Sequence, residues 1–282
     1  TDILQFVFMF TGFILLLVFA WGLSDGPTSL KSVLPEQYFD PTGGKSIQYI
    51  LVWFFIAMWT FIDPGFYQRT AAASSPHKAK KGILISIFFW FIFDILTVTT
   101  GLYAVALFPN QEAAMAYPVL ASRILPPFVY GIFLVGLFST IMSTIDSNGL
   151  ISAITFGRDI LLRIQKKEEQ RDENEYIRKG LVVMAFIAVL LALSIPSVIQ
   201  LWYVIGSIIV PGILLPFLLT FTQIRLNDGK IIPTMILPVI IAISWFLYGH
   251  FSGHYPMEIE PFYPGLFTSG MLVFINRSLY HT

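Results

Sequence analysis

Long apolar runs separated by short polar segments dominate this sequence. A helix needs about 20 mostly apolar residues to cross a bilayer, and only structures that satisfy their own backbone hydrogen bonds can do so. The pattern therefore predicts an all-α integral membrane protein, a multi-span helical bundle with about eight transmembrane helices. These spans are expected near residues 3–23, 47–66, 83–108, 127–157, 181–199, 201–222, 231–250 and 262–276.

Proline marks several predicted boundaries, because it ends or kinks a helix. Pro196, in the stretch Ser194–Ser197, divides the fifth span from the sixth. Pro118 and Pro127 bracket a short external helix, and the Pro- and Gly-containing segment 24–46 is expected to be an irregular external connection.

Basic residues in the loops predict the orientation. Fourteen of the seventeen Lys and Arg residues fall on one side of the predicted spans. Since cytoplasmic loops carry such an excess, loops 67–82 and 158–180 are expected in the cytoplasm, and the protein in the plasma or inner membrane of the cell. The mixed-charge run 163–179 is expected to be a solvated cytoplasmic helix or loop.

Composition excludes several classes of protein. Hydrophobic residues make up 56% of the chain and charged residues 12%. The net charge is zero, so the chain lacks the basic excess that is typical of a nucleic-acid-binding protein. The absence of cysteine excludes disulfides, iron–sulfur clusters and thiolate metal sites. Because the chain opens with Thr1 and enters a span almost at once, we expect a single transmembrane transporter domain, 1–282, that forms the C-terminal portion of a longer chain.

The fourth span carries the most informative polar residues. Ser139, Ser143 and Ser147 are spaced i, i+4, i+8, which places them on one helix face. One interpretation is a packing stripe of small residues whose hydroxyls bond to their own helix. Asp146 favours another, because a carboxylate at membrane depth is costly unless it is paired, protonated or bound to a cation. Hydroxyl and carboxylate oxygens together suit an alkali cation.

Other polar residues allow two interpretations each. Asp2 is either a carboxylate favoured by a helix N-terminus or part of a functional site. Asp94, in the third span, is an intramembrane acid without an evident partner. Pro64-Gly65 interrupts the second span near Trp59, either as an ordinary kink or as a broken helix that binds solute or ion. His250 and His254, followed by Glu258 and Glu260, are expected in a short external loop, where we expect no metal site.

Four stretches together resemble the sodium:solute symporter family, in the order of the family's ten-helix core. Thr1–Gln5 is similar to the start of the fifth core helix, and Gln68–Ala73 to the end of the sixth. The stretch Ile141–Ser147, with Arg158-Asp159-Ile160, is similar to the eighth, and Leu201-Trp202 to Pro211-Gly212 and Pro216 are similar to the tenth. The resemblance implies a leucine-transporter-type fold of two inverted five-helix repeats, with core helices one to four absent from this chain.

The resemblance also implies specific site residues. The main sodium site would use the Thr140 carbonyl and the hydroxyls of Ser143 and Thr144, together with carbonyls of the first core helix. A second ion site would use Asp2, Asp146 and Ser147, with Ser143 shared. Trp59 falls where an aromatic gate closes the substrate pocket in the sugar transporters of the family.

These features predict a sodium-coupled symporter that imports a small polar organic solute by alternating access, with sodium as coupling ion, no further cofactor and no enzymatic activity. Sugars, amino acids and carboxylates are the candidate solutes, and the lipid bilayer is the surrounding partner. Two alternatives remain: an ion or proton channel or sensor on the same scaffold, and an intramembrane hydrolase that uses Asp94 and Asp146.

Overall fold

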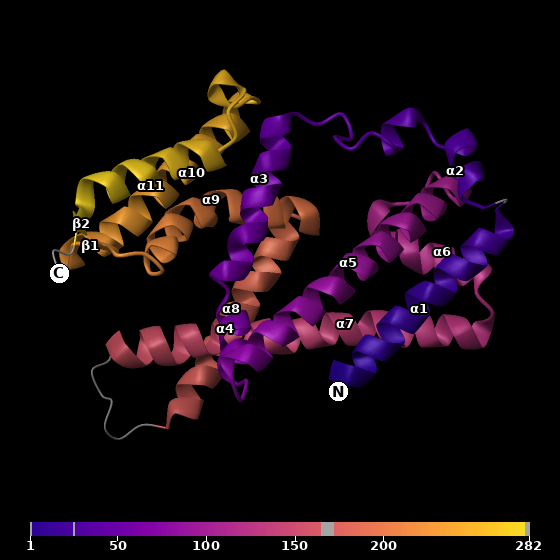
Figure 1. The fold of residues 1–282 in the computed structure, drawn as a ribbon, viewed down its shortest axis with the longest axis horizontal. Coiled ribbons are helices and arrows are strands. Elements are labelled where there is room, and N and C mark those ends of the chain that lie inside the picture. Colours follow the sequence, from indigo (N-terminus) through magenta and orange to yellow (C-terminus); the bar gives the residue numbers. More distant parts are fainter. Residues whose placement is uncertain (1, 25, 165–171, 280–282) are drawn as a thin grey trace. The chain divides into compact units, whose positions relative to one another are not determined.

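The structure is a computed structural model that describes residues 2–24, 26–164 and 172–279. Contacts divide the chain into two compact units, which we treat separately. Unit 1 consists of Thr1–Gly43 and Gln68–Met184, and unit 2 consists of Gly44–Tyr67 and Ala185–Thr282. Helices form nearly all of the described residues, and the fold class is all-α as predicted (Figure 1).

Unit 1 is built from three long helices and several short ones. Its elements are α1 (Asp2–Leu23), α2 (Pro27–Val33), η1 (Glu36–Tyr38), the second half of α4 (Pro64–Ala71), α5 (Pro76–Leu107), η3 (Ala113–Met115), α6 (Ala116–Ile124), α7 (Pro127–Ile154), η4 (Thr155–Leu162) and the first half of α8 (Glu173–Ser194). The segment η4 continues α7 as a π-helix.

Unit 2 contains the rest of the helices and a small hairpin. Its elements are α3 (Ile47–Ala57), η2 (Met58–Phe61), the end of α8, α9 (Val198–Leu219), β1 (Ile224–Leu226), η5 (Asp228–Lys230), α10 (Ile231–Ser252), η6 (Pro256–Glu258), α11 (Phe262–Asn276) and β2 (Arg277–Leu279). Strands β1 and β2 pair antiparallel, with Leu226 opposite Arg277.

The predicted spans correspond to helices, and the protein is membrane-embedded. Six helices in the described residues are long and apolar enough to cross a bilayer, and a seventh span results if α3–η2 and α4, bent by 41°, are counted together. The eighth predicted span is α11, whose 15 residues rise only about 22 Å.

Local sequence signals explain most helix boundaries. Helix α8 ends at Ser194, and the Ser197 hydroxyl accepts a hydrogen bond from the Gln200 backbone N–H, which caps α9 as the predicted break requires. The short helix expected near Pro118 is α6. The segment 24–46 is less irregular than expected, because Pro27 begins α2, and proline is favourable in the first turn of a helix.

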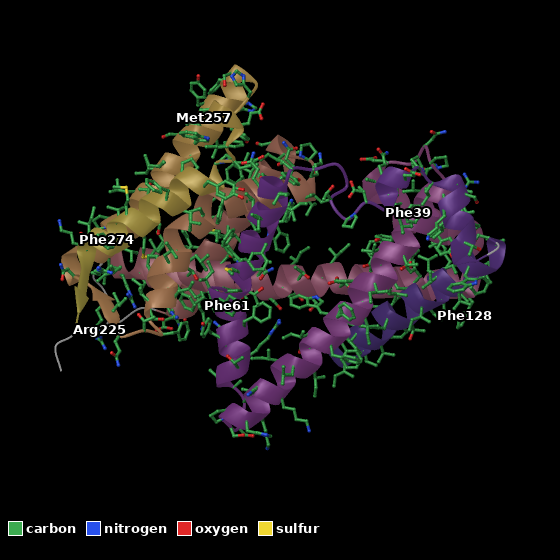
Figure 2. The ribbon with its side chains drawn as sticks, turned by 45° about the horizontal axis from the view of Figure 1, so that its top comes forward. Phe39, Phe61, Phe128, Arg225, Met257 and Phe274 are labelled. Carbon is green, nitrogen blue, oxygen red and sulfur yellow. The ribbon has the colours of Figure 1, made fainter. Side chains whose placement is uncertain are left out.

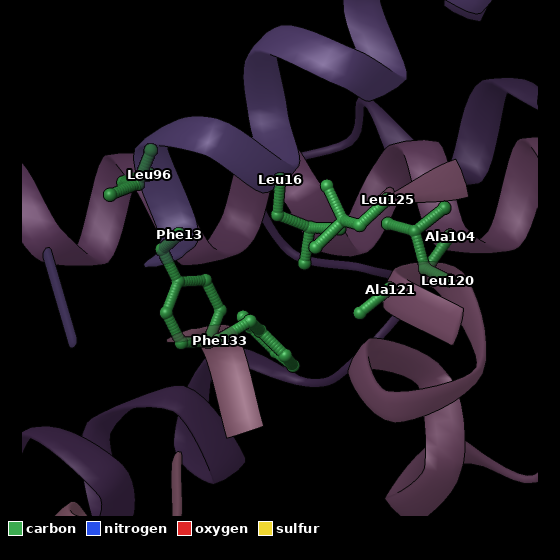
Figure 3. Close-up of a cluster of buried hydrophobic side chains, with 8 residues drawn as sticks. All are labelled: Phe13, Leu16, Leu96, Ala104, Leu120, Ala121, Leu125 and Phe133. Atoms are coloured by element: carbon green, nitrogen blue, oxygen red, sulfur yellow. The ribbon is translucent and has the colours of Figure 1, made fainter. Parts of the chain in front are cut away.

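Close packing of α1 with α5, α6 and α7 forms the core of unit 1. A Cβ on Gly136 would lie 2.9 Å from the Phe8 carbonyl oxygen, and one on Gly12 would lie 3.2 Å from the Phe133 Cα. The two glycines therefore let α1 and α7 approach closely, in antiparallel directions. Beside this crossing, Figure 3 shows the buried side chains Phe13, Leu16, Leu96, Ala104, Leu120, Ala121, Leu125 and Phe133.

Helix α9 lies at the centre of unit 2 and packs on α3, α10 and α11. Val52 and Ile56 of α3, Val210 and Leu214 of α9, and Phe262 of α11 form its buried apolar cluster. This cluster fixes the first half of the bent span α3–α4 against α9.

Candidate ion-binding site

Helix α7 carries the predicted sodium ligands in unit 1. Ser139, Ser143 and Ser147 are half-buried, and they continue the face on which buried Gly136 packs against α1. Ser143 lies two turns beyond Gly136. The predicted hydroxyl stripe is therefore confirmed as one helix face, directed toward the α1 side of the helix.

Two of the predicted ligands are joined by a hydrogen bond within the helix. The Thr144 hydroxyl donates to the Thr140 carbonyl oxygen at 2.9 Å, and the Thr140 hydroxyl donates to the Gly136 carbonyl oxygen at 2.9 Å. A donating hydroxyl retains acceptor lone pairs, and a carbonyl oxygen has two. The Thr144 hydroxyl therefore keeps acceptor capacity for a cation. The Thr140 carbonyl oxygen accepts both this hydroxyl and the Thr144 backbone N–H of the helix, so a cation would bind it in place of the hydroxyl hydrogen bond.

The Ser143 and Ser147 hydroxyls differ from these threonines. Among the residues that the structure describes, neither hydroxyl has a hydrogen-bond partner, and the same is true of Ser139 on this face. Because an uncompensated hydroxyl is unfavourable at membrane depth, all three oxygens would gain from a ligand.

Asp146 is exposed, and within the described part of the chain its carboxylate has neither a hydrogen bond nor an ion pair. Asp146 and Thr144 are two residues apart, so their side chains leave the helix about 160° apart. Ser143 lies between these directions. One ion therefore cannot contact both Thr144 and Asp146, whereas Ser143 lies about 60° from Asp146 and about 100° from Thr144 around the helix and is open to either site.

Asp2 begins α1, and its side chain lies outside the described residues. Gly136 of α7 lies beside Phe8 of α1. From this point Ser143 is seven residues further along α7, about 10 Å, and Asp2 is six residues back along α1, about 9 Å. The antiparallel register therefore brings the Asp2 backbone to about the level of Ser143 along the pair of helices.

The second span is broken at Asp63, in unit 2. The Asp63 Oδ1 accepts hydrogen bonds from the backbone N–H groups of Gly65 and Phe66 at 2.7 and 3.2 Å, and so caps α4. The half-buried Trp59 indole donates to Asp63 Oδ2 at 3.4 Å. Trp59, the predicted gate, is thus tied to the break itself. Trp59 belongs to unit 2, whereas the α7 residues belong to unit 1.

Asp94, on α5, is exposed, and no hydrogen bond or ion pair of its carboxylate is found among the described residues. Within the described ranges, no hydrogen bond joins Asp94 to Asp146, the pair that a hydrolase would use.

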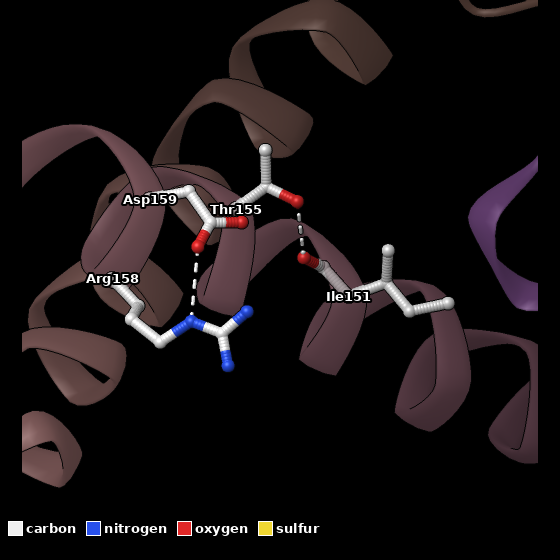
Figure 4. A network of polar contacts seen from close by, with 4 residues as sticks. All are labelled: Ile151, Thr155, Arg158 and Asp159. Atoms are coloured by element: carbon white, nitrogen blue, oxygen red, sulfur yellow. Dashed lines mark hydrogen bonds and ion pairs between the residues drawn. The ribbon is translucent and has the colours of Figure 1, made fainter. Parts of the chain in front are cut away.

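An ion pair lies in η4, which continues α7 toward its predicted cytoplasmic end. Arg158 Nε donates to Asp159 Oδ1 at 2.9 Å, and one turn earlier the Thr155 hydroxyl donates to the Ile151 carbonyl oxygen (Figure 4). Both charged side chains are part of the motif that carries the family resemblance.

The surface loop predicted for His250, His254, Glu258 and Glu260 begins later than expected, because His250 lies in the last turn of α10. Glu260 lies in the loop but is half-buried rather than exposed. Its carboxylate oxygen Oε2 is buried, and Tyr203 of α9 and Tyr255 lie beside it. Burial raises the pKa of the Glu260 carboxyl, and the nearby Tyr203 hydroxyl offsets this in part. Neither Glu260 Oε2 nor the Tyr203 hydroxyl completes a hydrogen bond of good geometry within the described residues. No local pattern predicts this burial, since the aromatic partners are distant in the sequence.

Hydrogen bonds hold the loop of Glu260 onto α3 and α10. Gln48 Nε2 donates to the Glu258 carbonyl oxygen at 2.7 Å, and Trp245 Nε1 donates to the Ile259 carbonyl oxygen at 2.8 Å. The Tyr263 hydroxyl donates to the Gln48 carbonyl oxygen at 2.7 Å. These bonds make the loop an integral part of unit 2.

Comparison with known proteins supports the family resemblance. The family model described as "Sodium:solute symporter family" matches residues 1–237. The chain is 26% identical to the sodium/pantothenate symporter of Haemophilus influenzae, covering 71% of this chain and 43% of that protein. It is 27% identical to the osmoregulated proline transporter OpuE of Bacillus subtilis, covering 97% and 58%. It is 23% identical to the high-affinity choline transporter 1 of Drosophila melanogaster, covering 74% and 36%. The chain spans about half the length of the curated relatives it matches.

Proposed function

Because the chain belongs to the sodium:solute symporter family, we propose that it couples sodium entry to the import of a small polar organic solute by alternating access. Residues 1–282 would act as one transporter domain in the plasma or inner membrane, with loops 67–82 and 158–180 in the cytoplasm. The observation that carries this proposal is the face of α7 on which oriented and unpartnered oxygens lie side by side at membrane depth.

The main sodium site would consist of the Thr140 carbonyl oxygen and the hydroxyls of Ser143 and Thr144. The hydrogen bond between Thr144 and Thr140 supports this set, because it shows that two of the three oxygens lie next to each other, and sodium would replace the hydroxyl proton between them. Sodium would take oxygen ligands in preference to the nitrogen and sulfur ligands of transition metals. Further ligands would come from outside the described structure.

A second cation, sodium or a proton, would be held by Asp146, with Ser147 and Asp2. The exposed position of Asp146 on the opposite flank from Thr144 supports a separate site. Ion binding would also offset the cost of its carboxylate at membrane depth.

Trp59 would contribute an aromatic gate above the solute. Its hydrogen bond to Asp63, which caps α4, supports a role at the break of the helix, where freed backbone groups are available for binding. The names of the relatives mention pantothenate, proline and choline. These molecules are all small but differ in charge, so they suggest the size of this chain's solute and not its charge.

Coupling would follow from a shift in populations. Sodium would favour the outward-open state and complete the pocket, and the bound solute would then favour closure. The membrane potential would contribute about 2.3 kcal/mol per charge per 100 mV, added to the concentration gradient.

The direct test is uptake of radiolabelled proline and pantothenate into proteoliposomes that contain the full-length protein, with an inward gradient of sodium or of potassium. Uptake is expected only with sodium. Ser143→Ala and Asp146→Asn are each expected to raise the sodium concentration for half-maximal uptake about tenfold, because each removes one ligand oxygen or its charge.

Ser139→Ala is the matched control, since Ser139 lies on the same face of α7 but belongs to neither proposed set; its sodium dependence should equal that of the wild type. Uptake that ignores sodium in the wild type and in Ser143→Ala alike would eliminate the ion assignment. If Asp146→Asn lowers thermal stability as much as it weakens sodium dependence, Asp146 is structural.

A further inference from the structure

Helix α11, in unit 2, has one packed face and one open face. On the packed face, a Cβ on Gly265 would lie 3.0 Å from Pro211 and 3.2 Å from Ala242. The open face holds a shallow groove of about 400 Å³, open to its surroundings and lined by side chains of this one helix: Phe267, Gly270, Met271, Phe274 and Ile275. Phe267, Met271, Phe274 and Ile275 are 71%, 50%, 64% and 64% exposed.

The shape of the groove follows from the residue between the two phenylalanines. Phe267 and Phe274 are seven residues apart, on one helix face, and Gly270 lies between them. A Cβ on Gly270 would have Leu215 Cδ1, at 3.9 Å, as its nearest neighbour, so this part of the groove is open. The groove runs about 12 Å along the helix axis from Phe267 to Ile275, close to the roughly 15 Å of one leaflet's hydrocarbon.

One basic side chain lies at the end of the groove. The Arg277 guanidinium carbon lies 4.3 Å from the centroid of the Phe274 ring, and Arg277 is exposed. Its strand β2 pairs with β1, where Arg225 is opposite Ser278, so the side chains of Arg225 and Arg277 leave opposite faces of the hairpin. Figure 2 shows Phe274 and Arg225 at the same edge of unit 2. In the predicted orientation, in which the loops with the excess of Lys and Arg are cytoplasmic, this end of α11 is on the cytoplasmic side.

We propose that this groove binds one acyl chain of an anionic phospholipid in the inner leaflet, with Arg277 at its phosphate. Three observations support a lipid as the occupant: the groove is apolar throughout its length, that length matches one leaflet, and the cation lies only at its cytoplasmic end. A guanidinium stacked on an aromatic ring is held in place and retains free donors for a phosphate. The inner leaflet is the negatively charged one.

The test measures lipid retention and is independent of transport. The full-length protein is purified from vesicles of equal phosphatidylglycerol and phosphatidylcholine, and retained lipids are counted by native mass spectrometry. The wild type is expected to retain phosphatidylglycerol preferentially. Arg277→Gln should reduce that preference about fivefold, the effect of one basic residue at an anionic surface. Gly270→Leu, which fills the groove, should abolish retention of this lipid.

Two matched controls accompany these variants. Arg123→Gln removes an exposed charge on the predicted outer side, and Gly82→Leu adds the same side chain at an exposed glycine of α5 with nothing within 4 Å; both should retain lipid as the wild type does. Equal retention of the two lipids by the wild type, or unchanged retention in Gly270→Leu, would overturn the proposal. A second copy of the chain in the groove would also overturn it. Met271→Cys detects that outcome as a disulfide-linked dimer, because the sequence has no cysteine of its own.

Discussion

Glu260 shows how a single residue acquires its properties from distant parts of the chain. Its buried carboxylate oxygen lies beside Tyr203 of α9, fifty-seven positions earlier in the sequence. Burial disfavours the charged form of a carboxyl, and this is the larger effect on its pKa. Proton binding at this position is therefore linked to the folding of unit 2.

The stability of the protein should depend on the protonation of Glu260. Its pKa is raised in the folded state above the ordinary value of 4.5, so its contribution to stability is fully present below that value and is lost as the pH rises through the raised pKa. Glu260→Gln, which is neutral at every pH, should therefore melt at a higher temperature than the wild type near pH 8 and lose the advantage near pH 4. Tryptophan fluorescence during heating measures the melting temperatures of the variant and the wild type at each pH.

Glu258→Gln provides the comparison for this prediction, because Glu258 is two residues away and exposed. Its melting temperature should follow that of the wild type across the same range. A pH profile for Glu260→Gln that runs parallel to the wild type would show that the carboxyl titrates normally.

The residues of the candidate ion site were predictable as a set, and their partners were not. Helical periodicity alone places Ser139, Ser143 and Ser147 on one face, since each is four residues from the next. The hydrogen bond from Thr144 to Thr140 depends on side-chain rotation. The exposure of Asp146 depends on which segments cover α7. Neither follows from spacing.

At the scale of helices, glycine determines where two elements approach. Gly157 of η4 and Gly180 of α8 meet at a crossing in unit 1. A Cβ on Gly180 would lie 2.4 Å from the Ala153 carbonyl oxygen and 2.8 Å from the Gly157 backbone nitrogen. These neighbours are backbone atoms, which cannot rotate aside, so the crossing requires glycine at this position.

Gly180→Ala should therefore destabilise the protein by about 1–3 kcal/mol, the usual cost of overpacking, although alanine favours helices. Thermal unfolding in detergent measures the loss. Gly149→Ala is the control, because a Cβ there meets only Leu181 Cδ1 at 3.9 Å; it should be neutral or slightly stabilising. Equal melting temperatures for the two variants would show that α8 does not pack on η4 in this way.

Boundaries of helices followed from local chemistry, whereas their packing did not. Pro196 and the capping Ser197 end one helix and begin the next as predicted, because both act within a few residues. The start of α8 at Glu173 came earlier than the apolar pattern predicted, since charged residues extend the helix beyond its predicted membrane segment. The crossings at Gly136 and Gly180 join segments far apart in sequence, and no periodicity indicates them.

At the scale of the whole molecule, charge is distributed unevenly across the membrane. The predicted spans put fourteen basic residues on one side and three on the other, although the net charge is zero. This asymmetry predicts the direction of every helix, and with it the side from which sodium enters the proposed site and the leaflet that faces the α11 groove.

Single cysteines test this orientation directly, because the sequence contains none. Ser74→Cys, in loop 67–82, should react with a membrane-impermeant maleimide only after the membrane of intact cells is permeabilised. Gln111→Cys, in the exposed connection before α6, should react in intact cells. Both positions are exposed, so a difference in labelling reports the side of the membrane rather than burial. The opposite pattern would reverse the orientation; sodium would then reach the α7 oxygens from the other side, and Arg277 would face the outer leaflet.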